Sequence, residues 1–143
     1  MRINEVLAGK GSRDVLTVRP DSTVRELLGL LAEHNIGALV VSADGGSVDG
    51  IVSERDVVRR LHEDEHVLDA PVSSIMSTEV QTCQGHQTVD ELMSLMTEHR
   101  FRHVPVVKND RLAGIVSIGD VVKSRMSELE FERDQLGHYV QGS

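Results

Sequence analysis

The chain has 143 residues, of which 39% are hydrophobic and only 2% aromatic, and a formal net charge of −8. The acidic balance argues against nucleic-acid binding, because a phosphate backbone is bound by a basic surface. Cys83 is the only cysteine, which excludes an intramolecular disulfide and a cysteine zinc site. The sequence has no apolar run of about 18 residues that would span a membrane. We therefore expect a soluble, cytoplasmic protein with an aliphatic core.

The first half of the chain predicts a strand, a helix, two strands and a second helix. Residues 15–18 are a brief strand, and apolar residues recur at helical spacing over 24–31, behind the capping residue Thr23. Two buried-type strands, 39–41 and 51–52, are joined by a hairpin loop and lead directly into the second helix.

The second half of the chain repeats this order. Val80, Thr88 and Val106 match positions 65 residues earlier, and Gly114 matches Gly50 at an offset of 64. A repeat of this kind indicates an internal duplication. Since each half is too small to bury much surface alone, the halves are expected to pack together. We divide the chain into a first repeat with its lead-in (1–68), a second repeat (69–126) and a helical tail (127–143).

One run, Gly-Ile-Val-Ser-x-x-Asp, occurs at 50–56 and again at 114–120. It places a serine at a helix start and an aspartate three residues later. This spacing is that of a capping box, in which both side chains bind backbone N–H groups. The same aspartates can also serve a ligand, and both roles can coexist. The copies differ, because Arg55 precedes the first aspartate and Gly119 precedes the second.

The doubled pattern resembles a tandem CBS-domain module, or Bateman module, of the small stand-alone bacterial type. The resemblance is carried by Thr-Val at 23–24 and 88–89, Arg-His-Val-Pro-Val-Val at 102–107, the link Pro-Val-Ser-Ser-Ile-Met at 71–76 and the doubled run. It implies an α/β (α+β) fold with two β-α-β-β-α repeats packed about a pseudo-twofold axis. It also implies a homodimer.

Proteins of this family bind adenine nucleotides between the repeats, so the resemblance implies AMP, ADP, ATP or NAD(H) as a regulatory ligand, with no cofactor required. Each family cleft combines the aspartate of one repeat, at the ribose position, with strand entries of the other. The first cleft would contain Asp56, Ser53, Arg55, Val80, Gln81, Phe101, Arg102 and His103. The second would contain Asp120, Ser117, Gly119, Lys10, Asp14, Val15, Leu16, Ile36, Gly37 and Ala38. The first is richer in cationic groups and is favoured for a phosphorylated ligand.

We therefore interpret the chain as a sensor of energy or redox state that modulates an unidentified protein. The alternative is a ligand-free dimeric scaffold that acts through its tail. In the tail, Leu129, Leu136 and Val140 share one helix face, which either closes the module or contacts another subunit. No nucleophile and base form a recognisable catalytic pattern, so an enzyme is not expected. The spacing of His62 and His66 suits a metal ion on a helix, but a solvated acidic connection is favoured.

Overall fold

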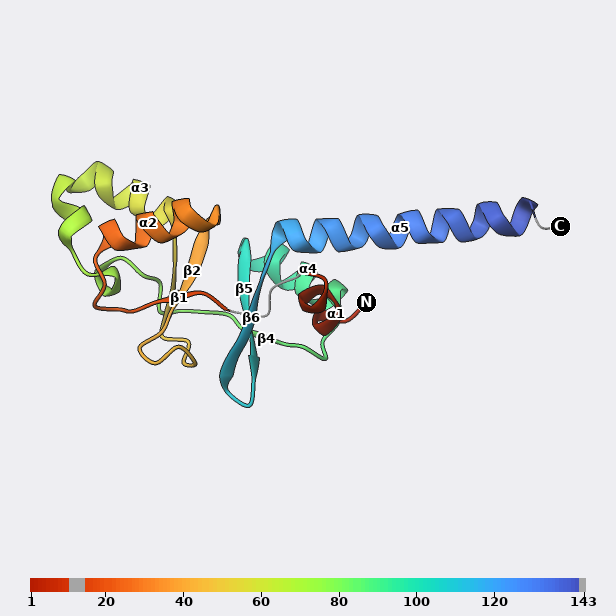
Figure 1. Ribbon diagram of the computed structural model, residues 1–143, viewed down its shortest axis with the longest axis horizontal. Helices are drawn as coiled ribbons and strands as arrows, with labels where there is room; N and C mark the ends of the chain where they lie inside the picture. The colour runs from red at the N-terminus through yellow and green to blue at the C-terminus, as the bar shows by residue number, and fades with distance from the viewer. Residues whose placement is uncertain (11–14, 142–143) are drawn as a thin grey trace.

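The computed structural model describes residues 1–10 and 15–141, which form two similar units side by side, with a long helix extending from the second (Figure 1). A short helix, α1 (Ile3–Ala8), comes first. The first unit contains β1 (Thr17–Val18), α2 (Val24–His34), β2 (Ala38–Val41), β3 (Gly50–Ser53) and α3 (Glu54–Glu63). Two 3-10 turns, η1 (Glu65–Asp69) and η2 (Val72–Ser74), link it to the second. The second unit contains β4 (Cys83–Gln84), α4 (Val89–His99), β5 (His103–Lys108), β6 (Arg111–Ser117) and α5 (Ile118–Gln141).

The two units repeat one another in topology and in local signals. Each sheet has three strands, in the orders β1-β2-β3 and β4-β5-β6, with a parallel and then an antiparallel pair. Thr23 and Thr88 cap their helices by accepting the backbone N–H three residues later, at 3.1 Å in both. Both helices end at a left-handed residue, Asn35 (φ 51°) and Arg100 (φ 59°). The predicted fold class of two β-α-β-β-α repeats is confirmed.

Each unit has its own aliphatic core, and each core is completed by a lead-in segment. Ile3 and Val6 of α1 are buried in the core of the second unit, while Val72 and Ile75 of the link are buried in the first. The repeat boundary predicted at 68/69 follows the sequence duplication. The packing divides the chain differently, because each lead-in covers the other repeat.

The lead-ins approach the sheets at matching glycines. A Cβ on Gly50 would lie 2.7 Å from the Met76 sulfur and 2.8 Å from the Ser77 backbone oxygen. A Cβ on Gly114 would lie 2.8 Å from a Leu7 methyl carbon. Glycine is therefore required at position 50, where a Cβ would meet backbone, whereas at position 114 the end of the Leu7 side chain would have to shift.

The hairpins of the two units also touch. The Leu112 N–H donates to the Gly46 carbonyl at 2.7 Å, and Arg111 pairs with Asp44 at 3.6 Å. Asp44 is itself held by the backbone N–H groups of Gly46 and Ser47, which keep its pKa well below the ordinary value. Within the described ranges, no helix is both long and apolar enough to cross a membrane.

Candidate functional site

A cleft of about 360 Å³ lies between the two units. Its walls come from the start of α3, the link after η2 and the residues that lead into β2 and β5. All eight residues predicted for the first cleft line it. The full lining is Gly37, Ala38, Ile51, Ser53, Glu54, Arg55, Asp56, Arg59, Ser77, Glu79, Val80, Gln81, Arg100, Phe101, Arg102 and His103.

The backbone places each helix start beside a strand entry of the same unit. The Glu54 N–H donates to the Gly37 carbonyl at 3.0 Å, and the Ile118 N–H donates to the Arg102 carbonyl at 2.8 Å. These matching bonds hold the two Ser-x-x-Asp runs in equivalent positions. Gly37 also borders the second unit, because a Cβ at this position would lie 3.8 Å from the His103 ring.

Asp56 caps helix α3 with one carboxylate oxygen and leaves the other oxygen unbonded within the described residues. Its Oδ2 accepts the Ser53 N–H at 2.8 Å and the Ser53 hydroxyl at 3.1 Å, while the Asp56 N–H donates to that hydroxyl oxygen at 3.3 Å. The capping box is thus present. Its Oδ1 accepts no hydrogen bond from the described residues, and Asp56 lines the cleft. One carboxylate oxygen is therefore available to a bound molecule.

Four arginines bring positive charge to this cleft in an acidic protein. Arg55 and Arg59 come from α3, and Arg100 and Arg102 flank the entry to β5. All four side chains are exposed. Guanidinium groups form paired hydrogen bonds with phosphate and carboxylate oxygens, so this rim suits an anionic group.

Two of these arginines, Arg59 and Arg100, were missed by the sequence analysis. Arg59 follows Asp56 by three residues on a helix, a spacing that places side chains on one face and could have identified it. Arg100 directly precedes the predicted pair Phe101 and Arg102. The acidic lining residues Glu54 and Glu79 were also missed, and no local pattern marked them.

His103 is half-buried and lines the cleft. Burial lowers the pKa of its imidazole below the ordinary value of 6.5, and the charges of Lys10 and Arg102 lower it further. Asp120 and Glu54 act in the opposite direction but do not outweigh burial. The neutral ring is therefore favoured at neutral pH, where it can donate or accept one hydrogen bond.

Asp120, the second aspartate, has a charged partner from its own chain. Its Oδ2 lies 2.8 Å from the Lys10 Nζ and accepts the Ser117 N–H at 2.8 Å. Lys10 also donates to the Ile115 carbonyl at 2.8 Å. Burial raises the pKa of Asp120, but the bonds from Lys10 and Ser117 outweigh it and hold that pKa below 3.8. The negative charge of this carboxylate is thus already balanced by the Lys10 ammonium.

Part of the second predicted set is brought together by direct contacts. Lys10, Ser117 and Asp120 meet, and Gly119 is exposed beside Ser117. Gly37 and Ala38, which were predicted for this set, line the first cleft. Leu16 of this set packs against the first core, and Val15 is half-buried. Ile36 is exposed. The remaining member, Asp14, lies outside the described residues.

Comparisons with known proteins agree with the two-unit architecture. A family model described as the CBS domain matches residues 8–63 and again 72–127. The CBS domain-containing protein YhcV of Bacillus subtilis is 34% identical over 113 residues, which cover 79% of this chain and 80% of the relative.

Solved structures show the same likeness. The CBS-domain containing protein ATU1752 from Agrobacterium tumefaciens has a TM-score of 0.83 and 48% identity, covering 87% of this chain and 99% of that one. CBSX2, solved in complex with AMP, has a TM-score of 0.74 and 24% identity over 88% of this chain and 96% of its own, and it shares the fold.

Proposed function

Because this chain belongs to the CBS-domain family, we propose that it is a regulatory module that binds an adenine nucleotide in the cleft between its repeats. The observation that carries this proposal is the meeting of Asp56, with one carboxylate oxygen available, and four arginines in a single cleft of about 360 Å³. The module has no catalytic role in this proposal. It senses AMP, ADP, ATP or NAD(H) and passes its bound state to another protein.

The chemistry of the cleft matches the parts of a nucleotide. The free Oδ1 of Asp56 accepts hydrogen bonds from the two ribose hydroxyls, and Arg102 with Arg55 binds phosphate oxygens in bidentate fashion. His103, neutral at neutral pH, can donate one hydrogen bond from its ring N–H. CBSX2, which shares this fold, was solved with AMP, and this supports an adenine ligand here.

The proposed module is a homodimer. Val58 and Leu61 on α3 are exposed apolar side chains, and so are Ile118, Val122 and Met126 on α5. Large apolar groups gathered on helix faces are typical of interaction sites.

A second candidate is a ligand-free scaffold that binds a partner through its tail, and the exposed apolar residues of α5 favour it. This scaffold predicts partner capture that survives loss of Asp56 and disappears when the chain is truncated after Met126. The nucleotide sensor predicts instead that the strength of capture depends on the nucleotide.

The test of the proposed function is a thermal-shift and calorimetric series with AMP, ADP, ATP, NAD⁺ and NADH at millimolar concentration. A ligand at about 100 times its Kd should stabilise the fold by about 2.7 kcal/mol. Asp56→Asn should weaken binding by about tenfold, because hydrogen bonds to the charged carboxylate are lost. At the same ligand concentration the stabilisation should therefore fall to about 1.4 kcal/mol.

Asp120→Asn is the matched control, since Asp120 makes the same capping bond to the backbone of its serine. It should leave the affinity of the first cleft nearly unchanged. If no adenine compound shifts the unfolding temperature, the proposed function is wrong.

A further inference from the structure

Helix α5 continues far beyond the body of the protein (Figure 1). Its first part is anchored, because Val121 is buried in the second core and Glu128 is half-buried. Every side chain from 129 to 140 is exposed. Most of the stability of helices in proteins comes from packing an amphipathic face, so we expect this segment to pack against another surface.

The exposed residues of α5 repeat with the period of a coiled coil. Val122, Met126, Leu129, Arg133 and Leu136 follow one another at alternating steps of four and three residues. The four apolar members are 51%, 57%, 55% and 67% exposed. They lie on a different face from Val121 and Glu128, which contact the body. We call these five residues the α5 seam.

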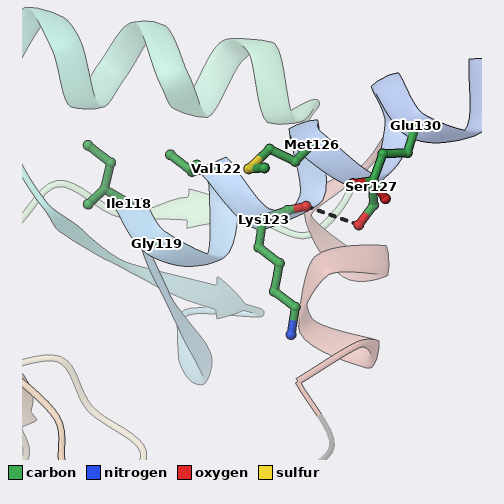
Figure 2. Close-up of a pocket in the computed structure, with 7 residues that line it drawn as sticks. All are labelled: Ile118, Gly119, Val122, Lys123, Met126, Ser127 and Glu130. Carbon is green, nitrogen blue, oxygen red and sulfur yellow. Dashed lines mark hydrogen bonds between the residues drawn. The ribbon is translucent and has the colours of Figure 1, made fainter. Parts of the chain in front are cut away.

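The start of the seam carries a groove of about 540 Å³ (Figure 2). Figure 2 shows Ile118, Val122 and Met126 following one another along one side of the helix. Gly119 has no side chain to fill the space between them. The groove is lined by Ile118, Gly119, Val122, Lys123, Met126, Ser127 and Glu130.

We propose that this groove receives residues 129–139 of α5 from a second copy of the chain, with the two helices antiparallel. Met126 of each copy then faces Leu129 of the other, and Leu136 enters the space above Gly119. Val122 faces the aliphatic stem of Arg133, whose charged end reaches solvent. The inference specifies the interface of the proposed homodimer and does not depend on nucleotide binding.

The charges beside the seam favour this register. With Met126 facing Leu129, Lys123 of one copy faces Glu130 of the other, and Arg125 faces Glu132. Because the pairing is symmetric, each contact occurs twice. Arg125 already binds Glu128 at 2.9 Å, but its guanidinium has further N–H groups to donate. Parallel helices would instead place Arg133 opposite Arg133, where like charges repel.

Cysteine cross-linking tests the direction of the helices. Met126→Cys and Leu129→Cys are prepared separately, with different mass tags, then mixed and oxidised. The antiparallel register predicts a disulfide between the two different variants, since facing seam residues approach closely enough. Wild-type protein is the control, because Cys83 is buried and burial raises the pKa of its thiol to about 11. A disulfide formed by Met126→Cys alone would show parallel helices and overturn the proposal.

Charge exchange tests the register. Lys123→Glu should weaken the dimer by about tenfold, and adding Glu130→Lys should restore it. Lys108→Glu is the matched control on an exposed residue away from α5. The Kd is measured by analytical ultracentrifugation. If Lys123→Glu does not change the Kd of the dimer, or if the mixed cysteine variants form no disulfide, the proposed pairing of the α5 helices is wrong. Either result is still compatible with a homodimer that uses another interface. A monomeric wild-type protein refutes both.

Discussion

The two Ser-x-x-Asp runs have the same local geometry and different surroundings. In each, the aspartate accepts the serine N–H at 2.8 Å and the serine hydroxyl accepts the aspartate N–H. Asp56 then faces an arginine-lined cleft, whereas Asp120 is 2.8 Å from Lys10. The motif therefore determines the cap, and residues from outside the motif determine what else the carboxylate can bind.

The source of this difference lies in the two lead-ins. Equivalent backbone bonds align them at an offset of 69, because the Ile3 N–H donates to the Gln87 carbonyl and the Val72 N–H donates to the Ser22 carbonyl. Lys10 is thereby matched with Glu79, which lines the Asp56 cleft and brings no positive charge to Asp56. A cation in one lead-in and an acidic residue in the other thus leave Asp56 available and give Asp120 a charged partner. In the proposed function this makes the two clefts unequal, with the Asp56 cleft as the site that a nucleotide occupies first.

The largest expected effect concerns the glycines that admit the lead-ins. Gly50→Ala should cost about 1–3 kcal/mol, because the added Cβ meets the backbone oxygen of Ser77, which cannot easily move. Gly114→Ala should cost less, since it meets the flexible end of Leu7. Urea unfolding of both variants measures the difference. Equal costs would mean that the two lead-ins are held with equal rigidity.

An intermediate effect is expected from Lys10→Met. Removing the ammonium leaves Asp120 half-buried without its cation, so we expect a loss of about 1 kcal/mol at neutral pH. Since the folded-state pKa of Asp120 is lowered, this contribution is present above 3.8 and is lost as the pH falls through the folded-state pKa. Unfolding free energies of both proteins should therefore converge in acid. A constant difference at all pH values would exclude the ion pair as the cause.

The same variant sharpens the functional comparison. Without Lys10, Asp120 resembles Asp56 more closely, and calorimetry with the bound nucleotide should show a second binding event per chain. Lys108→Met is a matched control on an exposed lysine. If Lys10 instead serves as a phosphate ligand, the variant will bind no better than wild type at this site.

The smallest effect is expected from His103. Its folded-state pKa lies below 6.5, so the unfolded chain binds more protons below that pH and stability falls as the pH drops from about 7. His103→Gln should reduce this pH dependence, while His62→Gln, on an exposed histidine, should not. Chemical unfolding at several pH values checks the slope. An unchanged slope would show that another group is responsible.

The sequence was sufficient for features that depend on local spacing or repetition. Thr23 and Thr88 begin helices because their hydroxyls accept the N–H three residues ahead, and that pattern is visible in the chain. The duplication predicted two equal sheets. Together with the family resemblance, it also identified all eight residues of the first set as neighbours in one cleft.

Only the tertiary structure decided which contacts form where the repeats meet. Gly37 and Ala38 line the Asp56 cleft, Lys10 forms an ion pair with Asp120 at 2.8 Å, and each lead-in packs on the opposite repeat. Helix-capping residues and the alternation of apolar residues in strands depend on a few neighbouring residues. They determine which helices and strands form, but not which of these elements pack against one another. The placement of one unit on the other follows from burying side chains far apart in the sequence, such as Ile3 and Val72 in the two cores. For that reason two copies of one motif, equal in sequence pattern and in local geometry, have different chemistry.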